Sequence, residues 1–479
     1  MVNSPETIIT NNINAEDTII YVLDETKVPE ELPNLMTLGT GTSAETVKVL
    51  EVSGNGKILT VERGFQGVAR SWSAGTVIAR NFTEYDYNAL MENINTLREN
   101  MAKTARFVVG TSTSRWTEKD CNYLCDGTND QEEINQAIQD LPASGGEIII
   151  LDGTYNIAAK INVNKNNVSI KGNGNATILK RMWDSSSEEG VITLNSVEGC
   201  RIQNLQIDGN KANYMSTNNH GIRLNSSNNN VITGNICNNN VHNGICLFSS
   251  SKNTVTGNTC INNANGVHLF SSSNNTIIGN ACNNNNMGIY LFSSSNDNNI
   301  TGNTCNNNGY DGIHLYSSIN DNTIAGNTCN NNKVGIFLDS SSNNTITGNT
   351  CNNNRNEGIF LYSSSNDNNI TGNTCNNNNN DGIRLHTSSN ENTITGNTCN
   401  NNKVGIYSYS SSNNTITGNT CIRGTGYTSD QYTILLDGSP NDYNLISSNN
   451  CMGKAVVIHG GIGNSAWGNK FDATNNLPS

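Results

Sequence analysis

The residues best suited to chemistry recur at one place in a tandem repeat. From Gly244 onward, tetrads of the type Gly-Ile-x-Leu are each followed by a further residue, y. Residues alternate sides along a β-strand, so the aliphatic positions face inward while x and y face outward. A solvent-facing strand surface is rarely rich in aromatic residues, so these columns predict a contact surface. The x column is Cys246, His268, Tyr290, His314, Phe337, Phe360, Arg384 and Tyr407, and the y column is Phe248, Phe270, Phe292, Tyr316, Asp339, Tyr362, His386 and Tyr409.

Two uses of this surface stay open. Aromatic, histidine and arginine side chains can hold sugars, and they can equally pack one subunit against another. The residues expected at a carbohydrate site or an interface are Tyr290, His314, Tyr316, Phe337, Phe360, Tyr362, Arg384, His386, Tyr407 and Tyr409. Phe248, Phe270 and Phe292 are expected to pack between subunits.

One acid, Asp339, interrupts the y column, and we expect it to lie between Tyr316 and Tyr362 of the neighbouring coils. Aromatic neighbours would hold a sugar and partly desolvate the carboxyl group. Desolvation raises the pKa of a carboxyl group, as acid catalysis requires. Asp339 is therefore the candidate catalytic residue.

A partner for Asp339 is not evident in the sequence. Glycoside hydrolysis usually needs two carboxyl groups about 5 to 9.5 Å apart. Three acids precede a tetrad glycine, five residues from the y column, which is about 16 Å along a strand and too far. The sequence therefore favours a protein that binds a polysaccharide without cleaving it over a hydrolase or a lyase. The acids are Asp311, Glu357 and Asp381 before the glycines, and Asp297, Asp321, Asp367 and Glu391 in loops.

Cysteines mark the repeat at intervals of 22 to 24 residues. Ligands of a metal converge on a point, whereas these cysteines form a line, and neighbouring parallel strands suit disulfide geometry poorly. We therefore predict a buried, reduced cysteine stack, with no metal site and no cofactor. The nine cysteines are Cys237, Cys260, Cys282, Cys305, Cys329, Cys351, Cys375, Cys399 and Cys421.

The spacing within the repeat predicts stacked coils. The step from an aliphatic residue to the cysteine is always five, as from Ile416 to Cys421, whereas two other segments vary in length. An odd step needs a corner, and Gly418-Asn419 supplies one, because both residue types tolerate left-handed backbone. We expect asparagine ladders with a spacing of about 4.8 Å, and about 13 coils over residues 145–470. The inward stack should contain Ile232, Val255, Ile277, Ile300, Ile324, Ile346, Ile370, Ile394 and Ile416.

A family resemblance rests on residues 120–180. This segment contains the Asp126–Asp130 start "DGTND", then a short helical stretch, "LDGTY" and "IKGNGNATI". It resembles the entry of pectate-lyase-like β-helices in phage tail proteins, and the resemblance covers residues 105–422. It implies an all-β, right-handed parallel β-helix in a tail spike that binds a host cell-surface polysaccharide. A polysaccharide depolymerase is the alternative, because the superfamily also contains lyases, hydrolases and epimerases, and a non-viral surface β-helix protein is a further one.

The remaining segments complete the expected organisation. Residues 1–82 read as a small β domain that resembles N-terminal regions of baseplate-attached phage proteins, so a tail or baseplate protein is the expected partner. Residues 83–104 should form a helical neck, residues 105–209 the cap and first coils, residues 210–422 the regular repeats and residues 423–479 irregular closing coils. In the cap, Ile134, Ala137, Ile138 and Leu141 share a helix face that Asn129 or Asp130 should cap. The neck has apolar residues at steps of three and four, which indicate either a short coiled-coil seam between subunits or an amphipathic helix packed on its own domain: Tyr87, Leu90, Ile94, Leu97 and Met101. The resemblance to tailspikes, which are trimers, implies a homotrimer joined at this seam.

Composition excludes other classes. The net charge of −13 argues against a nucleic-acid partner, which needs a basic surface. No apolar run has the length of a membrane span, and the first residues lack the pattern of a signal peptide. We therefore expect the protein in a virion tail or a phage-like extracellular particle, without membrane insertion.

Overall fold

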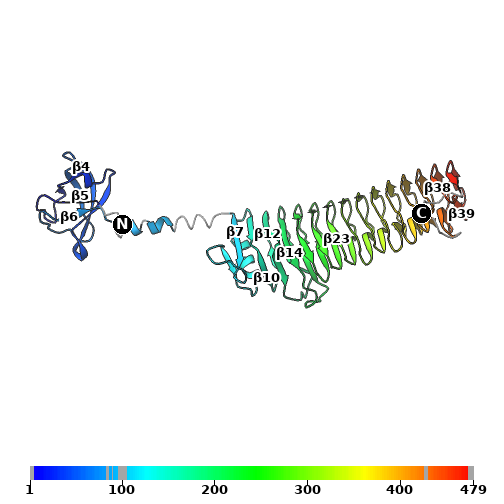
Figure 1. Cartoon of the computed structure of the whole chain (residues 1–479), viewed down its shortest axis with the longest axis horizontal. Coiled ribbons are helices and arrows are strands. Elements are labelled where there is room, and N and C mark those ends of the chain that lie inside the picture. Colours follow the sequence, from blue (N-terminus) through cyan, green and yellow to red (C-terminus); the bar gives the residue numbers. More distant parts are fainter. Residues whose placement is uncertain (1–4, 82–85, 89, 95–104, 425–429, 473–479) are drawn as a thin grey trace. The chain divides into compact units, whose positions relative to one another are not determined.

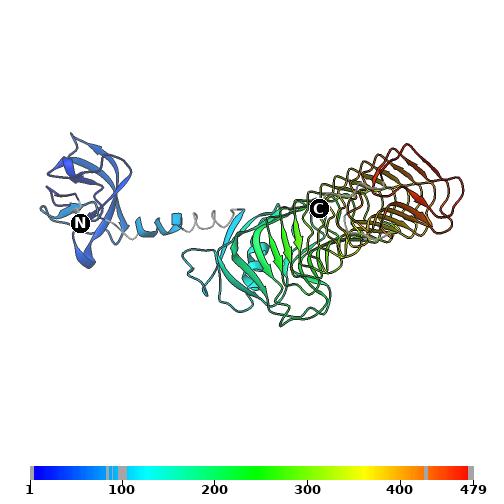
Figure 2. The same cartoon turned by 45° about the vertical axis from the view of Figure 1, so that its right-hand side comes forward.

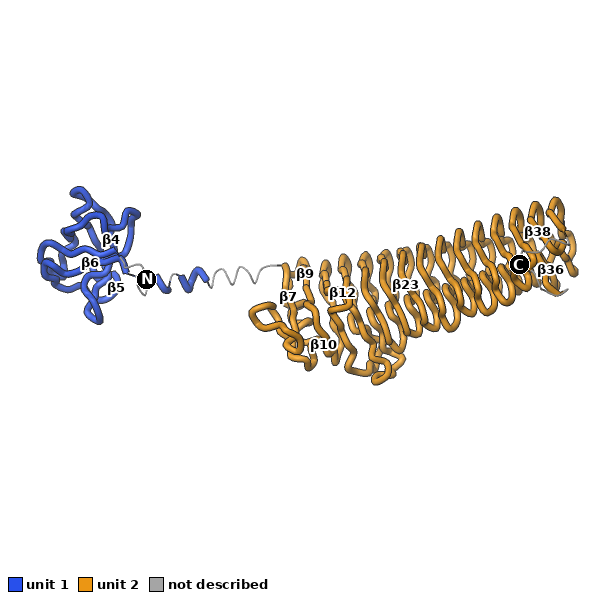
Figure 3. Tube along the Cα trace, in the orientation of Figure 1, with its two compact units in different colours: residues 1–103 blue, residues 104–479 orange. Residues whose placement is uncertain are grey.

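The computed structural model describes residues 5–81, 86–88, 90–94, 105–424 and 430–472. It divides into two compact units, Met1–Lys103 and Thr104–Ser479, which Figure 3 colours separately. Among the described residues, no helix has both the length and the apolar character needed to cross a membrane.

The first unit is a small β domain that contains β4, β5 and β6 (Figure 1). Its six described strands form an antiparallel sheet with the order β1-β6-β3-β4-β5-β2. Its core contains Met36, Leu38, Val47 and Leu59, all fully buried, because alternating apolar residues of the longer strands face one side. The elements are β1 (Glu6–Ile8), β2 (Ile19–Tyr21), the 3-10 turns η1 (Glu25–Lys27) and η2 (Gly41–Ser43), β3 (Asn34–Leu38), β4 (Glu45–Ser53), β5 (Ile58–Gln66) and β6 (Val77–Ala79).

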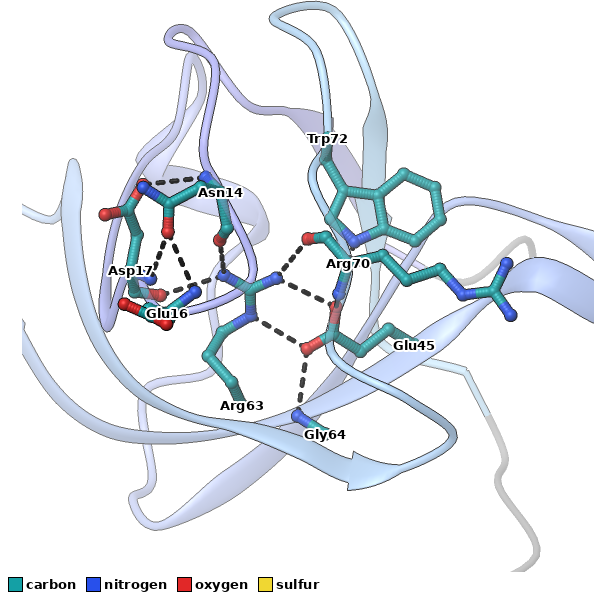
Figure 4. A network of polar contacts seen from close by, with 8 residues as sticks. All are labelled: Asn14, Glu16, Asp17, Glu45, Arg63, Gly64, Arg70 and Trp72. Atoms are coloured by element: carbon teal, nitrogen blue, oxygen red, sulfur yellow. Dashed lines mark hydrogen bonds and ion pairs between the residues drawn. The ribbon is translucent and has the colours of Figure 1, made fainter.

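A buried ion pair fixes the long strands of this unit. Arg63 donates to both carboxylate oxygens of Glu45, at 2.8 and 2.9 Å, and Trp72 donates its indole N–H to the same carboxylate (Figure 4). Burial acts to raise the pKa of Glu45, but these hydrogen bonds and those from the backbone of Gly64 and Arg70 lower it. The charge is therefore compensated in place, as a buried carboxylate requires.

The predicted neck is only partly described. Residues 86–88 and 90–94 are helical. Tyr87 and Leu90 are 53% and 51% exposed, and Ile94 is half-buried. Leu97 and Met101 lie outside the described residues, so the homotrimeric seam stays a prediction.

The second unit is a parallel β-helix whose coils stack in sequence order (Figures 1 and 2). One sheet has 20 strands. They are β7 (Arg106–Thr111), β8 (Tyr123–Cys125), β9 (Gly146–Ile150), β10 (Gly153–Ile157), β12 (Val168–Arg181), β14 (Arg201–Asp208), β16 (Val231–Thr233), β17 (Ile236–Asn238), β19 (Thr254–Thr256), β20 (Thr259–Ile261), β22 (Thr276–Ile278), β23 (Ala281–Asn283), β25 (Asn299–Thr301), β27 (Thr323–Ala325), β29 (Thr345–Thr347), β31 (Asn369–Thr371), β33 (Thr393–Thr395), β35 (Thr415–Thr417), β37 (Leu445–Ser447) and β40 (Ser465–Trp467).

A second parallel sheet of 13 strands carries the tetrads. Its strands are β11 (Ile161–Val163), β13 (Glu189–Asn195), β15 (Asn219–Asn225), β18 (Asn243–Phe248), β21 (Asn265–Phe270), β24 (Met287–Phe292), β26 (Asp311–Tyr316), β28 (Val334–Asp339), β30 (Ile359–Tyr362), β32 (Asp381–His386), β34 (Val404–Tyr409), β36 (Tyr432–Asp437) and β39 (Val457–Ile458). A short pair, β38 (Asn450–Met452) and β41 (Lys470–Asp472), completes the last coils.

The predicted core register is confirmed. Ile232 pairs with Val255, and the stack continues strand by strand to Ile416, with every member fully buried. The cysteines stack beside it: Cys237 pairs with Cys260, which pairs with Cys282. All fourteen cysteines are free, and all but Cys121 are buried.

Three asparagine ladders turn the corners of the coil. In the ladder predicted at Gly418-Asn419, each asparagine side chain from Asn258 onward accepts from the backbone N–H of the asparagine one coil below and donates to a carbonyl. Asn373, for example, accepts from the N–H of Asn349 at 2.9 Å and donates to the carbonyl of Ile346 at 2.9 Å. The residue before each of these asparagines is left-handed; it is glycine in most coils, with φ of 66° at Gly418, and serine at Ser448. These buried corner groups are therefore hydrogen-bonded, as a polar core requires.

Helix α2 (Gln131–Asp140) packs on the first strands with Ile134, Ala137 and Ile138 buried. The expected cap by Asp130 is wrong, because its side chain makes no capping bond to the helix. Its two oxygens accept instead from the backbone N–H groups of Gly127 and Asn156, which ties the helix to β10.

Candidate functional site

The predicted x and y columns are in register over the second sheet. In the x column, Tyr290 pairs with His314, which pairs with Phe337. The rings stack on their neighbours: the centroids of Phe337 and Phe360 lie 5.0 Å apart, and those of His386 and Tyr409 in the y column 4.8 Å apart. Because ring faces meet ring faces along the column, most of these rings are half-buried within one chain.

The stack opens at the predicted gap in the y column. Asp339 pairs with Tyr316 on one coil and with Tyr362 on the next, as expected. These two tyrosines are 41% and 37% exposed, more than the other rings of the two columns. The carboxylate of Asp339 accepts a hydrogen bond from Ser340 at 3.0 Å.

A second group of acids lies beside the x column. Glu357 and Asp381 occupy equivalent positions on consecutive coils, and each is 3% exposed. Arg384 places one guanidinium nitrogen, Nη1, 3.4 Å from Glu357 Oε1 and 3.6 Å from Asp381 Oδ2. These contacts limit the separation of the two oxygens to about 7 Å.

The strand conformation explains this proximity. Ile383 and Leu385 face the core, and a Cβ added to Gly382 would lie 2.8 Å from the Cβ of Cys399. Gly382 therefore faces inward as well, which breaks the alternation. Asp381 and Arg384, three residues apart, consequently share the outer face.

Burial and neighbouring charges set the pKa values of the two acids, and aromatic rings hold Arg384 between them. The pKa of Asp381 is raised to about 7, chiefly by burial and also by the negative charge of Glu357, while the positive charges of Arg384 and Lys403 oppose the shift. Burial also raises the pKa of Glu357. The guanidinium of Arg384 lies between the rings of Phe360 and Tyr407, 5.4 and 5.2 Å from their centroids. Such planar stacking is available to arginine but not to lysine.

Asp381 and Arg384 line a groove of about 630 Å³ that runs across β32, β34 and β36. Its walls carry aromatic rings, two further acids and a lysine. The other lining residues are Asn380, Lys403, Val404, Tyr407, Asp430, Tyr432, Leu435, Asp437 and His459. Concave sites with a few convergent polar groups are where ligands usually bind.

Two family profiles match the chain. The first is described as "Right handed beta helix region" and covers residues 280–421, and the second as "Periplasmic copper-binding protein (NosD)" and covers residues 139–310. The chain is a right-handed parallel β-helix protein. No curated protein matches it in sequence.

Solved structures share the β-helix. The A-module of Azotobacter vinelandii mannuronan C-5 epimerase AlgE6 has a TM-score of 0.50 at 17% identity, covering 74% of this chain and 97% of that one. The catalytic domain of a GH87 α-1,3-glucanase has a TM-score of 0.52 at 15% identity, covering 97% and 84%. The Dettilon tailspike protein has a TM-score of 0.50 at 16% identity, covering 70% and 66%. Identities this low show the fold and do not transfer an activity.

The β-helix adds a contact that the spacing of the acids did not predict. Glu357 and Asp381 lie on the outer face of the sheet but are buried there, and Arg384 contacts both. The y column lies five residues from each acid along the strand and offers no partner within reach. The x column lies only three residues away, and there it places Arg384 beside Asp381. The loop acids occupy exposed corners of the coil, where the backbone is left-handed. They are Asp297, Asp321, Asp367 and Glu391.

Sequence reasoning also missed a histidine cluster at the start of the repeats. One ligand atom from each of Glu188, His220 and His242 lies within 4.8 Å of the others. Burial lowers the pKa of both histidines, so both are neutral at pH 7. A second group, Cys125, Asp130 and Glu133, has similar spacing. There, both oxygens of Asp130 already accept backbone hydrogen bonds.

Proposed function

We propose that this β-helix binds a polysaccharide along the x and y columns and holds one of its sugar units in the groove at Asp381 and Arg384. The observation that carries the proposal is the groove itself, where the aromatic columns meet a buried acid, a stacked arginine and exposed polar groups. Sugar rings present apolar faces and hydroxyl groups together, which is the combination that such a site complements.

Two positions on the columns fit one extended ligand. Rings within the columns cover each other, so free aromatic surface occurs where the stack is interrupted. That interruption is at Asp339, between Tyr316 and Tyr362, whereas at Arg384 the guanidinium continues the stack and offers hydrogen-bond donors beside the groove. Both lie on the same sheet, two coils apart, so a chain of sugars running along the coil axis reaches both.

We propose a phage or phage-like tail spike as the setting, with residues 1–82 attaching to a tail or baseplate protein and a host glycan as the ligand. The two-unit organisation supports this setting, as does the shared fold with a tailspike. A non-viral surface β-helix protein is the alternative setting.

Binding is tested with immobilised polysaccharides from candidate hosts, with soluble α- and β-glucans and alginate as references. Arg384→Ala should weaken binding by roughly tenfold or more, because it removes the charged hydrogen-bond donor of the groove. Arg355→Ala removes an exposed arginine from a loop of the same β-helix and should leave the affinity unchanged. Equal affinity of wild type and Arg384→Ala for the bound glycan would contradict the proposal.

Depolymerisation is the second candidate, favoured by the raised pKa of Asp381. An acid that is half protonated near pH 7 can donate a proton to a leaving group, and the carboxylate of Glu357 lies no more than about 7 Å away, below the upper end of the separations used by glycosidase pairs. Glu357 does not line the groove, however, so binding is proposed first. If wild type shortens a bound polysaccharide and Asp381→Asn binds it without shortening it, the protein is a depolymerase. Asp339→Asn tests the acid chosen from the sequence in the same assay.

A further inference from the structure

Three consecutive coils bring the histidine cluster together. Glu188 immediately precedes β13, His220 lies in β15, and His242 immediately precedes β18. His220 is fully buried, His242 is half-buried and Glu188 is exposed. The cluster therefore reaches from the interior to solvent at one edge of the second sheet, on different coils from the groove at Asp381.

Two nitrogens of this cluster have no hydrogen bond. Among the described residues, Nε2 of His220 and Nδ1 of His242 are buried without any partner. A buried polar atom without a partner destabilises the fold unless a ligand satisfies it. The two rings are close, with centroids 4.7 Å apart, so one bound ion can satisfy both nitrogens.

The surroundings supply the outer partners that metal-binding histidines need. The side-chain amide of Asn243 lies 3.1 Å from Nδ1 of His220 and 3.2 Å from Nδ1 of His268. The amide nitrogen of Asn243 faces both rings, and its oxygen accepts from Nδ2 of Asn265 at 2.8 Å. An ion on Nε2 of His220 therefore requires the amides of Asn243 and Asn265 to turn together, so that the oxygen of Asn243 accepts the Nδ1 proton of His220. A carbonyl that accepts the second ring proton is the usual support of a metal-bound histidine.

Glu188 supplies the third ligand, and the nearby positive charge of Arg223 weakens the binding of a cation. One oxygen of Glu188 lies 3.1 Å from Nη2 of Arg223, which leaves the other oxygen for an ion. Two imidazoles and one carboxylate are the ligands of open zinc sites, whereas Ca²⁺ and Mg²⁺ prefer oxygen ligands alone.

We propose that Glu188, His220 and His242 form a binding site for a divalent transition-metal ion such as Zn²⁺, which joins three coils at the start of the regular repeat. The solvent side of Glu188 leaves a fourth position for water. The guanidinium of Arg223 holds the carboxylate in place and, by its charge, weakens the affinity of the site.

The test is titration of the full chain with Zn²⁺ in a calorimeter under reducing conditions. We expect one ion per chain, with affinity reduced roughly tenfold or more in both Glu188→Gln and His242→Gln. The matched controls Glu198→Gln and His386→Gln, which lie outside the cluster, should bind as wild type does. Arg223→Gln should bind Zn²⁺ more tightly, because it removes a nearby positive charge.

Glu188 is exposed, so its variant keeps the test valid if a variant of a histidine fails to fold. Zn²⁺ should also raise the melting temperature of wild type but not of Glu188→Gln, because an ion that binds only the folded chain stabilises it. Absence of one-equivalent binding, or unchanged affinity in both ligand variants, would overturn the proposal. A thiolate-to-metal charge-transfer band with Co²⁺ would place the ion on cysteines and overturn it as well. Glycan binding tests the other site separately.

Discussion

Arg384 shows how one residue can make two buried acids tolerable. Asp381 and Glu357 lie on neighbouring coils, where two full negative charges at this spacing would repel each other. The guanidinium contacts both, and its planar faces pack between Phe360 and Tyr407. The pKa of Asp381 is nevertheless raised, because burial destabilises its charged form more than Arg384 stabilises it.

This raised pKa predicts a pH-dependent stability. In the unfolded chain Asp381 titrates near 3.8, and in the folded chain at about 7. Its contribution is therefore complete below pH 3.8 and is lost as the pH rises to about 7, by an amount on the order of 4 kcal/mol. Asp381→Asn cannot ionise, so it should melt higher than wild type at pH 8 and close to wild type at pH 4.

Circular dichroism melts at pH 4, 6 and 8 measure this difference. Asp297→Asn is the matched control, because Asp297 is an exposed corner residue and the equivalent corner at Asn274 already carries asparagine. Its melting temperature should follow wild type at each pH. If Asp381→Asn melts below wild type at pH 8, Asp381 stabilises the fold as an ionised partner of Arg384, which contradicts the predicted increase in melting temperature.

At the scale of the element, a corner is a left-handed residue followed by a buried asparagine. The first position takes Gly, Asn, Asp, Lys or Glu in the regular coils, and Tyr443 or Ser448 near the end, because it needs only to tolerate the left-handed backbone. The second is fixed, because its amide must both accept and donate along the ladder. Two such corners are Asp367-Asn368 and, two coils later, Gly418-Asn419.

Removing one amide from a ladder should therefore destabilise the coil strongly. In Asn373→Ala, the N–H of Asn349 and the carbonyl of Ile346 lose their partners. Each unsatisfied group costs about 1 to 3 kcal/mol, so we expect a loss of roughly 2 to 6 kcal/mol. Urea unfolding measures the loss. Asn369→Thr is the control and should stay within about 0.5 kcal/mol of wild type, since its exposed position carries threonine on both neighbouring coils.

The elements also show what the sequence can predict. The constant step from Ile416 to Cys421 sets the register of the core, because a one-residue slip would expose a whole stack. The same logic of alternation failed at Gly382, where two consecutive residues face inward. Contacts such as that of Arg384 with Asp381 depend on this local break, and spacing alone does not contain it.

At the scale of the whole chain, the histidine cluster and the groove lie at opposite ends of one sheet, on β13 to β18 and on β32 to β36. A β-helix transmits little between distant coils, because each coil contacts only its neighbours. Substitutions at one site should therefore leave the other unchanged. This independence allows metal binding and glycan binding to be tested in one set of variants.

Assembly is the remaining whole-molecule question, and we predict a homotrimer. Tyr87 and Leu90 expose about half of their apolar surface on the described turns of the neck. Apolar residues that recur at steps of three and four are buried when helices pair along a seam. Light scattering at micromolar concentration should return three times the mass of the chain, 51.6 kDa. Leu90→Asp combined with Ile94→Asp should shift the mass toward the monomer, because two charges would have to be buried in the seam.

The control for this prediction is Asn88→Asp combined with Glu92→Gln, which changes polar residues of the same helix and keeps its apolar residues. This variant should remain trimeric. A wild-type chain that is monomeric at micromolar concentration contradicts the prediction. A trimer that survives the paired aspartates would place the contact elsewhere, and the half-buried rings of Phe248, Phe270 and Phe292 are the surface that Phe270→Asp would then test. Their faces already stack within one chain, at 4.9 Å between Phe248 and Phe270, so a partner there would meet ring edges.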